Sequence, residues 1–379
     1  MRIIISGGGT GGHIYPAITL IRAIQEKNSA VEFLYVGTRR GLEADIVPKE
    51  GIPFRVVDIR GFKRSLSLAN LGRAAAALAG VVKAMELVRS FRPDAAIGTG
   101  GYVCGPTLLA ASLLGVPTLI QEQNVVPGIT NRLLAKFVTR VAVGTPEAAV
   151  HFPRDKVVVT GNPIRREVMS ASREEALASF HFDPAKKMVL VSGGSQGARS
   201  INRAMIGVIA HYVAHPEVQI LHVTGRGDYE KTLGEIRAAG IDLAAAGIDL
   251  AAAGNIVVRP YLYDMPQALA AADLAVFRAG ALGIAELTAR GVPAVLVPYP
   301  YAAANHQEQN ARAMARAEAA QMILDKDLTA ERLLSVLAEL LHEESRLKRM
   351  GENSRALGRP QAAEEIAALV LAMTEGRKA

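Results

Sequence analysis

The sequence predicts an α/β protein built from two parallel-sheet domains, and three observations lead to this prediction. Short apolar runs of strand length alternate with segments long enough to form helices. These runs fall into two series, one in each half of the chain. Each series opens on a strand that leads through a glycine-rich turn into a helix. Together these features indicate two Rossmann-like domains, each a parallel sheet covered by helices.

The expected strands of the first series cover residues 2–6, 31–36, 95–97, 118–121 and 140–143. Those of the second cover residues 188–192, 218–223, 256–258, 274–277, 294–298 and 321–324. The turn formers Thr-Gly-Asn-Pro at 160–163 mark the joint between the series. We therefore expect an N-terminal domain at 1–163 and a C-terminal domain at 164–357. The remaining segment, 358–379, should carry an amphipathic helix at 361–374 that returns to the first domain.

Composition limits the functions that the chain can have. Its 379 residues are 50% hydrophobic and 21% charged, which excludes general disorder. A single cysteine, Cys104, and the lack of a secretory apolar segment at the start indicate a reducing, cytoplasmic setting. The uncharged stretch 95–121 is broken by glycines and prolines, which is typical of buried strand, turn and helix rather than of a membrane span. A net charge of +7 favours phosphorylated ligands or acidic lipid surfaces, whereas 5% aromatic residues and no basic tail disfavour nucleic acid.

The first glycine loop, residues 7–12, fits the dinucleotide pattern G-x-G-x-x-G. The second strand, however, is followed by Arg39 and Arg40 and not by the acid that holds the ribose of NAD. NAD is therefore disfavoured, and an NADP oxidoreductase stays an alternative. Five glycines in six residues exceed what helix packing needs and indicate a ligand at the backbone. His13 follows in the first turn of the helix, where the macrodipole disfavours the protonated ring, so a neutral histidine can act as a base.

Two later turns carry donors and acceptors suited to a nucleotide. The loop 192–199 presents backbone amides, a helix N-terminus and the Ser195 hydroxyl to a diphosphate, and it lacks the P-loop ending required for ATP hydrolysis. Glu286 is expected in the first turn of the helix after residue 280, where it can accept the hydroxyls of a ribose. An acid that only stabilises the helix N-terminus would explain it equally well. Amides at 305–310 suit sugar hydroxyls, although helix capping also accounts for Asn305.

Other patterns receive no catalytic role. Asp325-Lys326-Asp327 matches a metal-binding D-x-D, but its place before a helix favours capping and surface charge. With no cluster of Cys and His residues, we predict no metal and no cofactor. The repeat Gly-Ile-Asp-Leu-Ala-Ala-Ala at 240–246 and 247–253 is interpreted as a small duplication.

Six motifs in this order along the chain resemble the MurG-type glycosyltransferases. They are residues 8–13, 100–106, 122–124, 161–165, 193–199 and 278–286. The resemblance implies a GT-B fold, with two Rossmann-like domains facing each other across a cleft. It also implies transfer of N-acetylglucosamine from UDP-N-acetylglucosamine to lipid I, the lipid-linked muramoyl-pentapeptide, to give lipid II for peptidoglycan. The acceptor would lie on the N-terminal domain and the nucleotide sugar mainly on the C-terminal one.

Motif by motif, the resemblance also implies residue roles. His13 would be the candidate base, with Glu122 second. The donor would be surrounded by Thr10, Gly11, Gly12, Asn124, Arg165, Ser195, Gln196, Leu262, Ala281, Leu282, Gly283, Ile284, Ala285, Glu286 and Gln307. The chain departs from the family pattern at Gln121, where histidine is common, at Gly283, where threonine is common, and at Ala304 and Asn305, where aspartate is usual.

The resemblance implies a single displacement with inversion at the anomeric carbon, and two other GT-B functions share its donor motifs. These are a glycolipid synthase and a UDP-N-acetylglucosamine epimerase; a nucleotide-sugar-binding subunit without activity is a third alternative. Because the acceptor is lipid-linked, we expect a peripheral protein at the cytoplasmic face of the membrane. The segment 59–68 interleaves Arg60, Lys63 and Arg64 with apolar residues and is the expected contact with anionic lipid.

Overall fold

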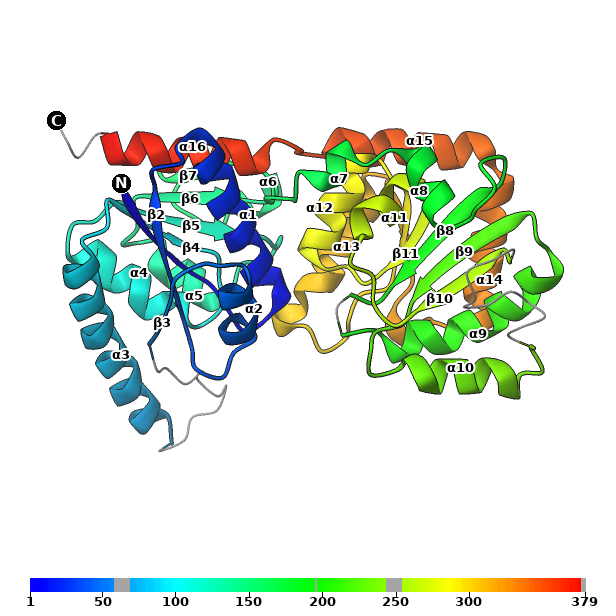
Figure 1. Ribbon diagram of the computed structural model, residues 1–379, viewed down its shortest axis with the longest axis horizontal. Helices are drawn as coiled ribbons and strands as arrows, with labels where there is room; N and C mark the ends of the chain where they lie inside the picture. The colour runs from blue at the N-terminus through cyan, green and yellow to red at the C-terminus, as the bar shows by residue number, and fades with distance from the viewer. Residues whose placement is uncertain (58–68, 195, 243–253, 376–379) are drawn as a thin grey trace. The chain divides into compact units, whose positions relative to one another are not determined.

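The computed structural model describes residues 1–57, 69–194, 196–242 and 254–375 (Figure 1). The chain forms two compact units: unit 1 comprises residues 1–164 and 360–379, and unit 2 comprises residues 165–359. Each unit has a parallel sheet with helices packed on it, so the predicted fold class, two parallel-sheet α/β domains, is confirmed.

Unit 1 contains a seven-stranded parallel sheet of order β3-β2-β1-β4-β5-β6-β7. In the interior strand β1, Ile3, Ile4 and Ile5 are fully buried, so both faces of the strand are covered, as expected for a parallel sheet between helices. The strands are β1 (Arg2–Ser6), β2 (Glu32–Gly37), β3 (Phe54–Val56), β4 (Ala95–Gly98), β5 (Thr118–Glu122), β6 (Arg140–Val143) and β7 (Val157–Val159).

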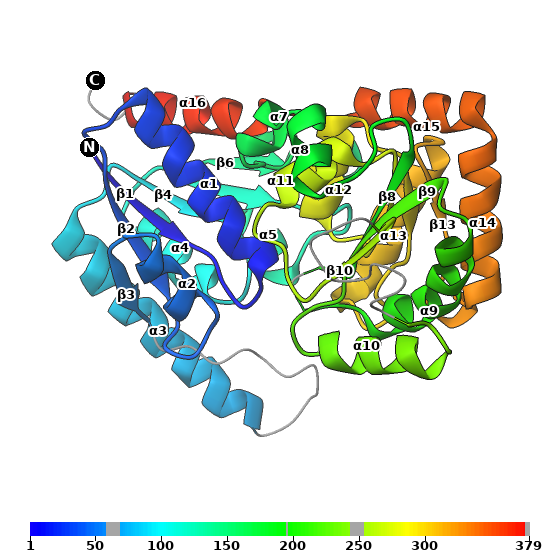
Figure 2. The ribbon, with the colours of Figure 1, turned by 45° about the vertical axis from the view of Figure 1, so that its right-hand side comes forward.

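Helices cover both faces of this sheet. One face packs on α1 (Gly11–Lys27) and α16 (Ala362–Glu375), and the other on α3 (Ala69–Phe91) and α4 (Cys104–Leu113). Shorter helices are α2 (Glu43–Lys49), α5 (Ile129–Leu134) and α6 (Pro146–Ala149). The last helix packs against α1 (Figures 1 and 2) and buries Ala363, Ile366, Ala367 and Val370 in the same core. This spacing of three and four residues presents one apolar face to the sheet.

Unit 2 repeats the plan with six parallel strands in the order β10-β9-β8-β11-β12-β13. The strands are β8 (Lys187–Ser192), β9 (Val218–Val223), β10 (Ile256–Arg259), β11 (Leu274–Phe277), β12 (Ala294–Leu296) and β13 (Ala320–Met322). The helices are α7 (Glu167–Ser170), α8 (Arg173–Ser179), α9 (Arg199–Ala214), α10 (Tyr229–Ala238), α11 (Met265–Ala271), α12 (Ala281–Arg290), α13 (His306–Arg316), α14 (Ala330–His342) and α15 (Glu344–Leu357).

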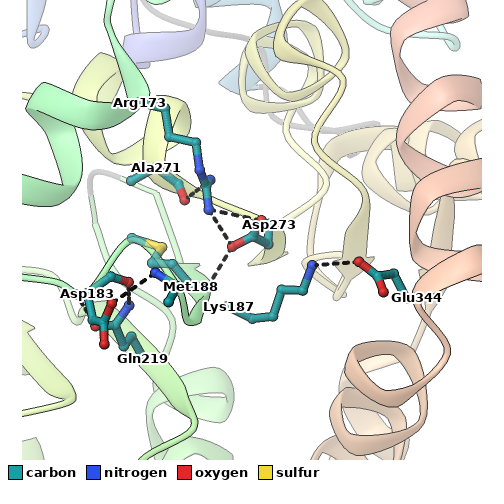
Figure 3. A network of polar contacts seen from close by, with 9 residues as sticks. Arg173, Asp183, Lys187, Met188, Gln219, Ala271, Asp273 and Glu344 are labelled. Atoms are coloured by element: carbon teal, nitrogen blue, oxygen red, sulfur yellow. Dashed lines mark hydrogen bonds and ion pairs between the residues drawn. The ribbon is translucent and has the colours of Figure 1, made fainter.

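The amino ends of β8 and β11 are held by an ion pair (Figure 3). Asp273 accepts two bonds from Arg173 Nη2, at 2.9 and 3.1 Å, and a third from the backbone amide of Met188 at 2.8 Å. Arg173 also donates to the carbonyl of Ala271 at 2.5 Å. These contacts join α8, α11 and two strands at the sheet edge opposite to the glycine loop.

In both sheets the strands are parallel, so their carboxyl ends share one edge. In unit 1 the first glycine loop, the 99–101 turn and residues 122–124 leave the sheet at this edge. In unit 2 the second glycine loop and the turns after β9, β10, β11 and β12 do the same. Ligands of open α/β sheets bind at such an edge, so these loops are where the site residues should be sought.

Candidate functional site

His13 lies in the first turn of α1 at the carboxyl edge of unit 1 and is half-buried. Its Nδ1 atom is 3.1 Å from the backbone carbonyl of Thr99 and 3.1 Å from the side-chain oxygen of Gln123. A backbone carbonyl only accepts, so Nδ1 carries the proton of the neutral ring. The lone pair is then on Nε2, which is the nitrogen able to take a proton from a substrate.

A chain of buried amides fixes this arrangement. Gln123 donates to the carbonyl of Thr99 at 2.6 Å and also bonds the side chain of Gln121, while Gln121 donates to Asn162 at 2.9 Å. Asn162 in turn donates to the carbonyl of Gln123 at 3.0 Å. Gln121 is completely buried, so it orients Gln123 and does not face a substrate. The departure from the family pattern at this position therefore affects the support of His13.

Glu122, the second candidate base, is 1% exposed and engages four donors. Oε1 accepts from the amide and the side chain of Asn124, at 3.0 and 3.3 Å. Oε2 accepts from the amide of Gly128 at 3.1 Å and from Asn131 at 2.9 Å. This carboxylate shapes the loop between β5 and α5, and the geometry favours His13 over Glu122 as the base.

The first glycine loop combines crowded and open positions. A Cβ at Gly7 would lie 2.0 Å from the Thr99 hydroxyl, and Gly9 has a φ of +86°. Gly12 is exposed, and a Cβ there would meet nothing closer than 3.5 Å. Close packing explains Gly7 and the positive φ explains Gly9, and the backbone at Thr10, Gly11 and Gly12 is the part that a ligand can approach.

The second glycine loop, in unit 2, leads into the N-terminus of α9. The N-cap residue Ala198 makes no side-chain capping bond, and the first turn contains no acid, so the helix end is suited to an external anion. A Cβ at Gly197 would lie 2.2 Å from the carbonyl of Thr224, which explains this glycine by close approach of two backbones. Gln196 is exposed on the loop, whereas Ser195 lies outside the described residues.

Glu286 lies in the second turn of α12 because the helix begins at Ala281. The expectation that it lies in the first turn is wrong, and an explanation by the helix dipole does not apply. Instead the carboxylate pairs with Arg165, whose Nη2 and Nε both reach Oε1, at 3.1 and 3.4 Å. Burial raises the pKa of the Glu286 carboxyl, and the Arg165 guanidinium opposes this shift. Oε2 takes no part in the ion pair with Arg165.

The other donor residues predicted in unit 2 also lie at its carboxyl edge. The N-terminus of α12 has no side-chain capping bond. Its first turns carry five half-buried residues, Ala281, Leu282, Gly283, Ile284 and Ala285. Leu262 follows β10 and is half-buried. Gln307 accepts a bond from the amide of Tyr299 at 2.9 Å and so holds the turn after β12. Asn305 makes no capping bond; its side chain donates to Glu308 at 2.6 Å.

Arg278 and Asp325 form a half-buried ion pair at the same edge. Asp325 also accepts from the hydroxyl of Ser200 at 2.5 Å, and Arg278 donates to that hydroxyl at 2.9 Å and to the carbonyl of Val297 at 3.2 Å. The first acid of the D-x-D pattern thus has a structural explanation, since it ties the start of α9 to the ends of β11 and β12.

Comparisons with known proteins show the family to which the chain belongs. Residues 3–143 match the glycosyltransferase family 28 N-terminal domain, and residues 188–366 match its C-terminal domain. A Desulforamulus reducens protein is 47% identical over 97% of both chains, and a Bacillus subtilis protein is 46% identical over 97% of this chain and 98% of its own. Both are named UDP-N-acetylglucosamine--N-acetylmuramyl-(pentapeptide) pyrophosphoryl-undecaprenol N-acetylglucosamine transferase.

Among solved structures, the Acinetobacter baumannii MurG crystal structure has a TM-score of 0.75 and 28% identity to this chain, with 98% of this chain and 99% of that one covered. Within the described ranges, no helix is both long and apolar enough to cross a membrane. The resemblance inferred from the six motifs is confirmed, and the interpretation as an NADP oxidoreductase finds no support. The chain belongs to glycosyltransferase family 28, among the MurG-type N-acetylglucosamine transferases.

Proposed function

We propose that this protein transfers N-acetylglucosamine from UDP-N-acetylglucosamine to the lipid-linked muramoyl-pentapeptide lipid I and so forms lipid II. The observation that carries the proposal is the 46–47% identity, over nearly the whole length of both chains, to transferases of that name. The structure supports it with a histidine held in one tautomer in unit 1. In unit 2 an uncapped helix N-terminus and a buried acid suit a nucleotide.

The reaction is a single displacement. Nε2 of His13 takes the proton of the acceptor hydroxyl while that oxygen attacks the anomeric carbon of the donor sugar. The bond from this carbon to the diphosphate breaks on the opposite face, so the configuration inverts and UDP leaves. The amides at the N-terminus of α9 and the guanidinium of Arg165 stabilise the charge on the departing diphosphate.

For the donor, we assign the ribose hydroxyls to Glu286 and the diphosphate to the second glycine loop with Arg165. When the nucleotide binds, Arg165 exchanges part of its ion pair with Glu286 for a bond to phosphate, and Oε2 of Glu286 accepts hydrogen bonds from the ribose hydroxyls. The remaining predicted donor contacts are Thr10, Gly11, Gly12, Asn124, Ser195, Gln196, Leu262, Ala281, Leu282, Gly283, Ile284, Ala285 and Gln307.

The Glu286 assignment predicts a loss of donor binding. Glu286→Gln should weaken UDP binding by about 1 to 3 kcal/mol, because a charged acceptor for two hydroxyls becomes a neutral one. Calorimetry with UDP measures this affinity, and transfer of labelled N-acetylglucosamine from the UDP-sugar to lipid I measures the activity. The KM for UDP-N-acetylglucosamine should rise accordingly.

Asp273→Asn provides the matched control, because Asp273 is also an acid paired with an arginine in unit 2 but lies at the opposite sheet edge. It should lower stability and leave UDP affinity unchanged. Equal UDP affinity in parent and Glu286→Gln would refute the ribose assignment. A parent protein that binds UDP but transfers no sugar to lipid I would refute the proposed function.

A surface of unit 1 supports membrane contact. Ile129, Leu133 and Phe137 follow one another at intervals of four residues and are 64%, 62% and 55% exposed. The exposed cations Arg132 and Lys136 alternate with them. We call these five residues the α5 surface. Apolar side chains between cations suit acyl chains below anionic headgroups, and the cytoplasmic leaflet carries such headgroups. The segment 59–68, expected to make this contact, lies outside the described residues.

Vesicle co-sedimentation tests the α5 surface. The parent should bind vesicles that contain phosphatidylglycerol, bind poorly to phosphatidylcholine alone and dissociate at high salt. Leu133→Glu with Phe137→Glu should bind at least tenfold more weakly, because two acids oppose the headgroup charge. Val150→Glu is the control, since Val150 is 80% exposed and lies outside the α5 surface. If both variants bind as the parent does, the membrane contact lies elsewhere.

A further inference from the structure

The first glycine loop encloses a carboxylate that comes from the chain itself. Glu43, the first residue of α2, is 1% exposed. Its Oε2 accepts from the amide of Gly9 at 3.0 Å, and its Oε1 accepts from the amide and the hydroxyl of Thr38, at 3.0 and 2.7 Å. These hydrogen bonds lower the pKa of the Glu43 carboxyl, although burial opposes them, so the group is charged at neutral pH.

Three glycines make the space for this side chain. A Cβ at Gly8 would lie 2.5 Å from Glu43 Cδ, one at Gly37 would lie 2.7 Å from its Cγ, and one at Gly41 would lie 2.2 Å from its carboxylate oxygens. The bulk of Glu43 therefore requires glycine at positions 8 and 41, and Glu43 requires it at position 37 together with the ring of Phe54, which would also be 2.7 Å away. In a dinucleotide-binding loop the corresponding need arises from the close approach of a phosphate.

The same loop is fixed from the other side by the elements that hold His13. The amide of Gly8 donates to the carbonyl of Gly100 at 3.3 Å, and the Thr99 hydroxyl donates to the carbonyl of His13 at 2.7 Å. Because β1 lies between β2 and β4 in the sheet, the backbone between Gly7 and His13 is held from both neighbours. Glu43 supplies the contact to Gly9 from the β2 side.

We propose that Glu43 is a positioning residue for the reaction: its carboxylate takes the Gly9 amide in place of an external phosphate and thereby fixes the backbone that presents His13. Glu43 does not touch the substrate. Its effect on turnover passes through the loop, so this inference rests on the proposed role of His13. It also explains why a loop with a dinucleotide pattern has no need of a dinucleotide.

Removal of the carboxylate gives a test with chemical rescue. Glu43→Ala leaves the Gly9 and Thr38 amides without their acceptor and opens a space of the size of a small carboxylate. We expect kcat to fall by about 10- to 100-fold, since small displacements of a catalytic group have effects of this size. The KM for UDP-N-acetylglucosamine should rise as well, because the same loop carries the predicted donor contacts Thr10, Gly11 and Gly12. Sodium formate or acetate should restore part of kcat, and sodium chloride at equal ionic strength should not.

Thr38→Val is the matched control, because it removes one bond to Oε1 and leaves the bond to Gly9 in place. It should lower the melting temperature but keep kcat within threefold of the parent value and show no formate effect. Equal losses of kcat in the two variants, or a kcat of Glu43→Ala within threefold of the parent, would overturn the proposal. The proposal would also be overturned if formate raised the melting temperature of Glu43→Ala but left its kcat unchanged.

Hydrogen exchange separates this inference from the proposed function, because it needs no substrate. In Glu43→Ala the amides of residues 9–13 should exchange at least tenfold faster than in Thr38→Val. If Glu43→Ala does not fold, Glu43→Gln serves instead. The glutamine NH2 group is a donor, so it cannot accept from the backbone amides that the two carboxylate oxygens now bind. Unchanged exchange at residues 9–13 would overturn the positioning role. A parent without transfer activity would refute the function alone.

Discussion

Replacement of His13 by alanine should lower kcat for transfer to lipid I by about 10²- to 10⁴-fold, the usual contribution of a general base. The acceptor hydroxyl is a poor nucleophile while it keeps its proton, and Nε2 is the nitrogen of His13 that carries the lone pair when Nδ1 donates to Thr99 and Gln123. Steady-state kinetics with saturating UDP-N-acetylglucosamine and lipid I measure the loss. UDP affinity should change little, because the base acts on the acceptor.

His13→Asn distinguishes the loss of the base from the loss of structure. The asparagine amide occupies the place of Nδ1 and can still donate to the carbonyl of Thr99, but it offers no basic nitrogen. Both variants should therefore lose the same activity. If His13→Asn keeps kcat within tenfold of the parent, the proton is taken by another group. Residual activity in His13→Ala that rises with added imidazole would support the assignment further.

Much of the fold could be predicted because both sheets are built from continuous buried apolar runs. The expected strands at 2–6, 140–143, 218–223 and 274–277 coincide with β1, β6, β9 and β11. Two edge strands, β3 (Phe54–Val56) and β7 (Val157–Val159), were not expected. Each has three residues that are exposed or half-buried, so the continuous apolar pattern of a central parallel strand is missing. These segments form strands because their backbones pair with the neighbouring strands β2 and β6.

The residues of the candidate site could be predicted where they lie together in one loop. Glycines at the end of a strand and a histidine directly after them are visible in a short window of sequence. The partners that make His13 useful are not, because Thr99 and Gln123 are 86 and 110 residues away along the chain. Arg165 and Glu286 were each predicted, but their pairing across 121 residues depends on the tertiary fold.

Glu43 shows what sequence reasoning missed. An acid that opens a short helix is ordinary, and nothing in the surrounding residues indicates that its side chain turns inward to the loop after β1. The available signal was an excess of glycine at positions 8, 37 and 41 around one acid. That signal can be interpreted only when the three glycines are known to surround the same side chain.

Below pH 6, unit 2 should lose stability through His222. This residue lies in β9, is completely buried, and donates from Nε2 to the side-chain oxygen of Asn202 at 3.0 Å. Its Nδ1 atom has no hydrogen-bond partner among the described residues, and burial lowers the pKa of the ring to about 3. The unfolded chain, with an ordinary histidine pKa near 6.5, binds the proton first as pH falls.

The sign of the effect follows from this difference in proton binding. Between pH 6.5 and pH 3 the unfolded state holds a proton that the folded state does not, so the free energy of unfolding falls as pH decreases. The stabilisation is fully present above pH 6.5, and roughly 3 kcal/mol of it is lost by pH 4. Urea unfolding from pH 4 to pH 8 measures the total change, and hydrogen exchange at the amides of β8 and β9 assigns it to unit 2.

His222→Gln isolates the contribution of this ring, because the glutamine amide can still donate to Asn202 but does not titrate. Its free energy of unfolding should depend less on pH than that of the parent, by roughly 3 kcal/mol between pH 4 and pH 7. His215→Gln, at an exposed histidine at the end of α9, should follow the parent profile. Parallel profiles for the parent and His222→Gln would show that the buried ring does not set the acid limit. A flattened profile would also connect that acid limit to the second glycine loop, because Asn202 donates to the carbonyl of Thr224, against which Gly197 packs.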